Sequence, residues 1–123
     1  MKKGRLQNMT VSDLVHRFTA IGIDQDRSLL SRQHAKFNRL FDEMVAIEDE
    51  LKRREGDQRR ELLRLFDHPN AQVRLNAVKA TLAVAPELAR EKLERMAASR
   101  EYPQAGDAGM TLISLDRGIF KPT

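Results

Sequence analysis

The sequence predicts an all-α fold of five to six helices, and three observations lead to this prediction. Apolar residues recur at helical spacing along most of the 123-residue chain. The composition, 41% hydrophobic and 33% charged, is typical of helices with solvated outer faces. The apolar run at residues 110–115 is the one strand candidate, and because no second strand exists to pair with it, a helix is favoured there too.

The N-terminal part is expected to begin with a tail and a short helix. Residues 1–9 carry no periodic pattern, so we expect a flexible tail ahead of a single helical domain over residues 10–123. Thr10 is the expected N-cap of the first helix, and Asp13 is its capping-box partner three residues later. This helix is expected over Val11–Gly22, with the glycine as its stop.

A long second helix is expected over residues 26–54. Acidic residues near its end precede basic residues by four positions, which is the stabilising order, and Gly56 provides the break. An apolar stripe repeats every seven residues along it. This stripe would serve either for packing within the chain, which is favoured because it spans only three heptads, or as a homodimer seam. The stripe consists of Leu30, Phe37, Met44 and Leu51.

The C-terminal half is expected to contain four shorter helices. The first covers residues 58–66 and is capped by Asp57. The second covers residues 71–85 and is apolar on most sides, so it belongs at the centre of the domain. The third begins at Pro86, and the fourth contains residues 110–115. Further capping positions are expected at Asn70, Asp107 and Gly118.

Residues 62–82 resemble one helical repeat of the HEAT or armadillo type. Such repeats place an Asp/Pro turn after a short apolar helix, followed by Val-Arg and an alanine-rich inner helix. The resemblance implies an α-α superhelix. It also implies that Arg74 bonds neighbouring turns, with Asp67 as the expected partner, and contact of Arg74 with a ligand is the alternative. The long helix at 26–54 departs from the repeat pattern. The matching positions are Asp67, Pro69, Val73, Arg74, Ala77 and Leu82.

The chain as a whole, from Met9-Thr10-Val11 to Gly118-Ile119-Phe120-Lys121-Pro122, resembles a family of small uncharacterised bacterial proteins, a domain of unknown function. The segments at residues 37–43 and 104–108 also resemble this family. The resemblance implies an α-α superhelix in a bacterial cytoplasm, and it brings no activity with it.

The residues that carry chemistry form no recognisable site. The chain has no cysteine, which excludes disulfides, thiolate nucleophiles and cysteine-based metal sites. His16, His34 and His68 form no spaced metal motif. A metal or acid–base role for His34 with Asn38 and Glu48 is the alternative to a hydrogen-bonded histidine. We therefore expect no cofactor, no metal and no enzymatic activity.

The N-terminus and the hydropathy pattern bear on location. The basic start, Met1-Lys2-Lys3, is followed by no apolar segment of the kind that signal peptides have. No stretch approaches the ~20 apolar residues that cross a bilayer. We therefore expect a cytoplasmic protein that is not bound to a membrane.

The favoured function is a helical scaffold that binds another protein, through a groove lined by Gln72, Asn76 and Lys79 on the helix at 71–85. The alternative is nucleic-acid binding, because the net charge is +4 and basic residues gather between the helices at 26–54 and 58–66. Nearby acidic residues reduce the net positive charge of this basic junction. It consists of Lys52, Arg53, Arg54, Arg59, Arg60 and Arg64.

Overall fold

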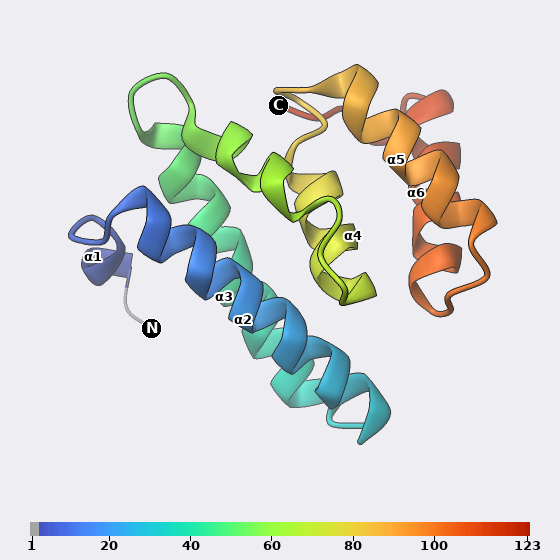
Figure 1. Cartoon of the computed structure of the whole chain (residues 1–123), viewed down its shortest axis with the longest axis horizontal. Helices are drawn as coiled ribbons and strands as arrows, with labels where there is room; N and C mark the ends of the chain where they lie inside the picture. Colours follow the sequence, from blue (N-terminus) through green and yellow to red (C-terminus); the bar gives the residue numbers. More distant parts are fainter. Residues whose placement is uncertain (1–2) are drawn as a thin grey trace. The chain divides into compact units, whose positions relative to one another are not determined.

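The computed structural model describes residues 3–123, and over that range it contains six α-helices, one 3₁₀ helix and no strand (Figure 1). The all-α prediction is therefore confirmed for this part of the chain. The chain divides into two compact units, Met1–Glu61 and Leu62–Thr123, which are described separately below. This division does not test the expectation of one domain over residues 10–123, because a domain can contain two compact units.

The first unit is a helical hairpin with a short additional helix. It contains α1 (Lys3–Leu6), α2 (Val11–Leu30) and α3 (His34–Arg53). Helices α2 and α3 run side by side along their length (Figure 1). Their facing sides bury apolar residues at helical spacing, and removing these side chains from water is the main favourable term in folding. The most deeply buried residues of the hairpin are Leu14, Phe18, Ile21, Ile47 and Leu51.

Part of the segment that is expected to be a flexible tail, residues 1–9, is helical where the structure describes it, and its flexibility stays a prediction. Residues 3–6 form α1, and the side chain of Leu6 is buried. The Leu6 carbonyl accepts a hydrogen bond of 2.9 Å from the Arg54 guanidinium, 48 residues later in the chain. The sequence does not predict this helix, because four residues are too few for a periodic apolar pattern and the contact that holds them is distant in the chain. Residues 1 and 2 lie outside the described residues.

The expected long helix at residues 26–54 is wrong, and so is the stop at Gly22. Helix α2 continues through Gly22, which is buried in the helix, and ends at Leu30. The break falls at residues 31–33, where Arg32 adopts a left-handed conformation with φ of 58° and Gln33 N–H donates to the Ser28 carbonyl at 2.8 Å. A glycine inside a helix costs only about 1 kcal/mol, which burial of the surrounding face offsets.

The seven-residue stripe is consequently divided between two helices. Leu30 is on α2 and is 82% exposed, whereas Met44 and Leu51 are buried on α3 and Phe37 is half-buried. The four residues do not form one continuous seam. Packing within the chain accounts for the two buried positions, and a homodimer through the stripe remains a prediction.

The second unit consists of three helices around one core. After the 3₁₀ helix η1 (Gln58–Leu65), α4 (Ala71–Ala80), α5 (Pro86–Ala98) and α6 (Gln104–Asp116) follow. Seven of the ten residues of α4 are buried, which confirms its expected position inside the fold. Helices α5 and α6 pack against each other, and both pack against α4. The core consists of Leu75, Val78, Leu82, Ala89, Leu93, Met96 and Ala108.

Several helix ends follow the sequence signals. Thr10 and Asp13 form the expected capping box on α2. The Asn70 side chain accepts hydrogen bonds from the backbone N–H groups of residues 72 and 73, which caps α4. Pro86 is the first residue of α5. Gly118, with φ of 69°, closes α6 by donating to the Leu115 carbonyl. These interactions are local, so the sequence alone predicts them.

Other boundaries differ from the prediction. The segment expected as a helix at 58–66 is 3₁₀ rather than α. The helix expected over residues 71–85 ends at Ala80, because the buried Thr81 hydroxyl bonds the carbonyls of residues 77 and 78 and the chain then turns toward Pro86. Asp107 is not an N-cap, since α6 already begins at Gln104 and Asp107 lies in its first turn.

Replacing Arg32 by Gly is expected to raise the free energy of unfolding. A left-handed conformation costs a residue with a Cβ atom roughly 1–2 kcal/mol, whereas glycine adopts it freely and loses about 0.5–1 kcal/mol in extra unfolded-state entropy. The expected net gain is therefore about 0.5–1 kcal/mol, measurable by urea unfolding. Arg27→Gly, on the exposed side of α2, is the control and should be destabilising. Equal destabilisation by both variants would contradict the turn at residue 32.

Candidate functional site

The basic junction expected to bind nucleic acid contains arginines that are already bound to carboxylates. Glu50, whose side chain is only 7% exposed, accepts hydrogen bonds from Arg54 at 2.8 Å and from Arg53 at 2.9 Å. These bonds, first that from Arg54 and then that from Arg53, hold the pKa of the Glu50 carboxyl below its ordinary value. Arg54 also bonds the Leu6 carbonyl, so it connects α1 to the end of α3.

Arg59 is likewise bound to a carboxylate of the chain itself. Its guanidinium forms two bonds to the Asp57 carboxylate, Nε–Oδ1 at 2.9 Å and Nη2–Oδ2 at 2.6 Å. The hydrogen bond from Arg59 lowers the pKa of Asp57, and the same bond raises the pKa of Arg59. Lys52, Arg60 and Arg64 are exposed. The guanidinium groups of residues 53, 54 and 59 are therefore already bound to acidic side chains of the chain itself.

Two of the three residues expected to line a binding groove are inside the protein. Gln72 is 6% exposed and Asn76 is 5% exposed. The Gln72 amide donates to the Asn76 side-chain oxygen at 3.0 Å and accepts from the Gln104 amide at 3.0 Å. Lys79 is half-buried and forms an ion pair with Asp107 at 3.0 Å. These residues connect α4 to α6, so Gln72 and Asn76 do not line an open groove, and a partner-binding role for the three residues stays a prediction.

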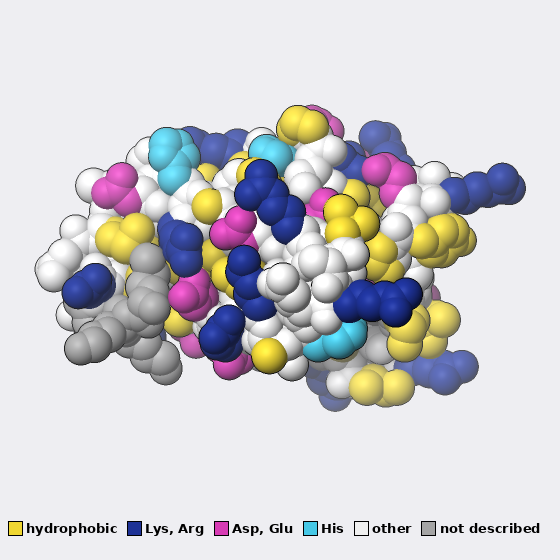
Figure 2. Space-filling model, turned by 90° about the horizontal axis from the view of Figure 1, so that it is seen from below, with side chains coloured by type: hydrophobic (Ala, Val, Ile, Leu, Met, Phe, Trp, Pro, Cys, Tyr) yellow, Lys and Arg dark blue, Asp and Glu magenta, His cyan; other side chains and the backbone are white. Residues whose placement is uncertain are grey.

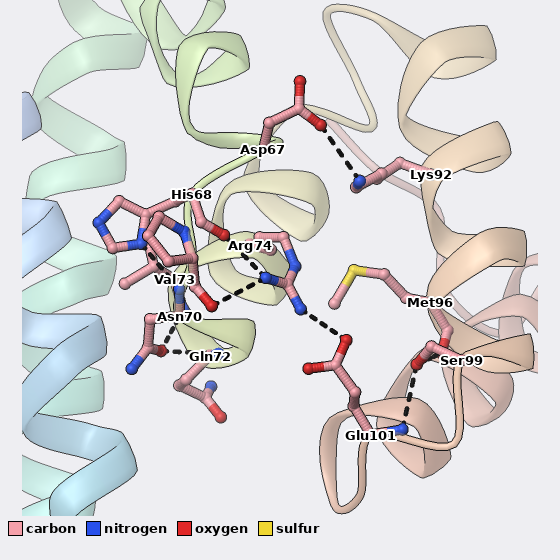
Figure 3. A network of polar contacts seen from close by, with 11 residues as sticks. Asp67, His68, Asn70, Gln72, Val73, Arg74, Lys92, Met96, Ser99 and Glu101 are labelled. Atoms are coloured by element: carbon pink, nitrogen blue, oxygen red, sulfur yellow. Dashed lines mark hydrogen bonds and ion pairs between the residues drawn. The ribbon is translucent and has the colours of Figure 1, made fainter.

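The second unit has a different groove, with a volume of about 340 Å³. Its walls come from the turn before α4, from α4 itself, from α5 and from the segment that follows α5 (Figure 3). Two acidic and three basic side chains meet there beside a methionine and a serine. The lining residues are Asp67, Arg74, Lys92, Arg95, Met96, Ser99 and Glu101.

Arg74 is the fixed element of this groove. Its guanidinium donates to the His68 carbonyl at 2.8 Å, to the Pro69 carbonyl at 3.1 Å and to the Glu101 carboxylate at 2.8 Å (Figure 3). The side chain is only 14% exposed. The expectation that Arg74 bonds the neighbouring turn is therefore confirmed. Its acidic partner is Glu101, however, and not Asp67.

The turn that presents Arg74 is itself held by short-range bonds. The Asn70 N–H donates to Nδ1 of His68 at 3.0 Å, and Asn70 in turn caps α4 (Figure 3). On the opposite wall, the Ser99 hydroxyl donates to the Met96 carbonyl at 2.7 Å and accepts from the Glu101 N–H at 3.1 Å. Hydrogen bonds between side chains and backbone groups thus hold both walls of the groove in place.

The remaining charges of the groove are held more loosely. Lys92 lies 3.5 Å from the Asp67 carboxylate, which is 98% exposed. Arg95 pairs with Glu91 at 2.6 Å, and both side chains are more than half exposed. A pair that is exposed on both sides, such as that of Arg95 and Glu91, contributes only about 0.2–1 kcal/mol, so an incoming ligand can replace it at little cost.

The sequence identified only part of this groove. Asp67 and Arg74 were noted because they occupy positions of the repeat pattern. Five lining residues on α5 and after it were missed, since nothing in their local spacing marks them. The signal in the sequence is the interleaving of opposite charges, and Figure 2 shows Lys and Arg side chains interspersed with acidic and apolar ones. The missed residues are Lys92, Arg95, Met96, Ser99 and Glu101.

The described residues contain neither a metal-binding cluster nor a membrane-spanning helix. Over residues 3–123, no group of three or more His, Asp and Glu side chains is placed to hold a metal ion. Within the same range, no helix has both the length and the apolar character that crossing a bilayer requires. The expectations of no cofactor and no enzymatic activity remain predictions.

These features define a small all-α protein with a mixed-charge surface groove. Residues 12–116 match the family model described as a domain of unknown function (DUF2019), and the chain belongs to this family. It is similar to a solved structure, the crystal structure of the protein RPA1889 from Rhodopseudomonas palustris CGA009, with 57% sequence identity and a TM-score of 0.94. The similarity covers 96% of this chain and 98% of that one. No curated protein matches the chain.

Replacing Glu50 by Gln is expected to lower the free energy of unfolding at neutral pH by about 1.5–3 kcal/mol, the value of hydrogen bonds to charged groups. Because pairing lowers the pKa of Glu50 in the folded state, its contribution is complete above the unfolded-state pKa and disappears as the pH falls through the folded-state pKa. The difference between wild type and variant should therefore narrow as the pH falls below about 4.3, the ordinary pKa of a glutamate, and close only below the lower folded-state pKa. Urea unfolding as a function of pH measures it.

The control for this prediction is Glu55→Gln, which removes the same charge from an exposed position. Its unfolding curves should follow those of the wild type throughout. A stability difference for Glu50→Gln that persists unchanged in acid would contradict the pairing with Arg53 and Arg54.

Replacing Arg74 by Ala is expected to cost about 1.5–3 kcal/mol of stability, because two carbonyls and the Glu101 carboxylate lose a charged donor. Arg95→Ala should cost less than about 0.5 kcal/mol, since its pair with Glu91 is exposed. Thermal and urea unfolding measure both effects. Equal costs for the two arginines would show that the bonds of Arg74 do not hold the turn.

Proposed function

We propose that this protein is a small helical scaffold of the HEAT or armadillo type that binds another protein through the groove of its second unit. One observation carries the proposal. The groove of about 340 Å³ combines a fixed arginine with loosely paired charges of both signs and an apolar side chain. Its volume is at the low end of the range of about 300–1,000 Å³ for ligand pockets, which suits a short peptide segment.

The composition of the groove favours a polypeptide over a nucleic acid. Asp67 and Glu101 would repel phosphate groups, whereas a peptide supplies N–H donors for their carboxylates. Lys92 and Arg95 provide matching donors for peptide carbonyls or acidic side chains, and Met96 offers an adaptable apolar contact. Because the groove contains both acidic and basic side chains, it also favours one orientation of the bound ligand.

The repeat resemblance supports the same proposal. The bonds from Arg74 to the carbonyls of the preceding turn match the role that a HEAT-type repeat implies for this position. In proteins built from such repeats, stacked helical pairs present extended surfaces that bind other proteins. The helical pair α5 and α6 follows the inner helix α4 in the same order that a second repeat would have.

The test combines affinity capture at low and high salt with a charge-reversed groove. The variant Lys92→Glu with Arg95→Glu is compared with Lys36→Glu with Arg39→Glu, which carries the same charge change on exposed positions of α3. A protein retained by the wild type at both salt concentrations should bind the groove variant at least about tenfold more weakly, a loss of about 1.4 kcal/mol. The α3 variant should bind as the wild type does.

Other outcomes decide against the proposal. Equal binding by the wild type and the groove variant would place the partner elsewhere on the surface, and retention of no protein at either salt would contradict the scaffold role. Nucleic acid that is captured at low salt and lost at high salt would support the basic junction at residues 52–64 instead, because phosphate contacts release counterions.

A further inference from the structure

Helix α6 carries apolar side chains on both of its faces, although a single copy of the chain uses only one. Its inner face buries Ala105, Ala108 and Thr111. On its outer face, Met110 is 71% exposed and Ile113 is 51% exposed, one helical turn apart. A surface helix normally has a polar outer face, so this arrangement indicates a second contact.

The C-terminal residues enlarge this apolar surface. Beyond Gly118 the chain turns back, and the N–H groups of Ile119 and Phe120 both donate to the Ser114 carbonyl, at 2.9 and 3.1 Å. Phe120 is thereby held beside α6, and Ile119 is exposed next to it. Phe120 and Met110 line a hollow of about 270 Å³, together with Lys79, Thr111 and Ser114.

We propose that this face of α6 binds a second copy of the chain, with the two α6 helices antiparallel across a two-fold axis between positions 110 and 113. The outer face contains Gly106, Met110, Ile113 and Arg117, and the spacing of four, three and four residues is the same when it is read in either direction. An antiparallel partner therefore places each Met110 opposite the partner's Ile113.

The charges at the two ends of the face are complementary under the same symmetry. Asp107, which pairs with Lys79 of its own chain through Oδ1, keeps 46% of its side chain exposed near the start of α6. Arg117 follows its last residue and has no ion-pair partner among residues 3–123. In the antiparallel pair, Arg117 of each copy reaches Asp107 of the other, so the ion pair forms twice. Gly106 leaves room for the arginine, because a Cβ atom there would meet only Tyr102, at 3.9 Å.

The hollow gives the interface its shape. Met110 of one copy, which is unbranched and adaptable, enters the hollow between Met110 and Phe120 of the other. Because both copies use the same surface, the contact is closed and yields a dimer, not a filament. The groove between Arg74 and Lys92 does not take part, so this inference is independent of the proposed function.

The first test is the mass of the full chain in solution as a function of concentration, by sedimentation equilibrium. The wild type should dimerise. Ile113→Glu should weaken dimerisation at least about a hundredfold, because it places two carboxylates at the two-fold axis. Leu88→Glu introduces the same change at an equally exposed apolar position, 57% exposed on α5, and should leave the dimer intact.

The second test exchanges the charges. Asp107→Arg and Arg117→Asp should each weaken self-association, because like charges then face each other across the two-fold axis. A mixture of the two variants should form a heterodimer, since each arginine again meets an aspartate, and a purely structural effect on either chain would not produce this rescue. A wild-type chain that is monomeric at all concentrations, a dimer unaffected by Ile113→Glu, or absence of the rescue would each overturn the proposal.

Discussion

The buried amides of α4 are the constraint on which the second unit depends. Gln72 and Asn76 are almost fully buried, and a buried amide without a partner costs about 1–3 kcal/mol. Gln72 is satisfied by Asn76 on one side and by Gln104 on the other, so α6 has to begin where Gln104 can reach α4. The ion pair between Lys79 and Asp107 fixes the next turn of α6 in the same register.

This register decides which side chains of the second unit are exposed. With Gln104 held inward, Met110 and Ile113 face solvent, and the segment before α6 brings Glu101 to Arg74. The exposed apolar face of α6 and the charged groove thus both depend on the attachment of α6 to α4 through Gln104. They differ in chemistry, since the first suits a symmetric apolar contact and the second suits an extended polar segment.

The candidate site was only partly predictable, for reasons visible in particular residues. Arg74 belongs to a local pattern with its turn, so its bond to that turn was foreseen. Its partner Glu101 is 27 residues away and depends on how α5 and α6 pack. Arg59 belongs to the basic junction that the sequence predicts, but one edge of its guanidinium, Nε and Nη2, bonds the Asp57 carboxylate. A charge pattern does not reveal which charges are already paired.

The sequence by itself determined the helical class of the chain and the helix ends that depend on side chains within one turn, such as the Thr10 capping box, the Asn70 cap and the Gly118 stop. Only the tertiary structure decided that Gly22 continues a helix, that the chain turns at Arg32 and that Gln72 is buried. The physical reason is that burial and ion pairing depend on contacts between residues distant in the chain, and these outweigh the roughly 1–2 kcal/mol that a local backbone preference contributes at a single position.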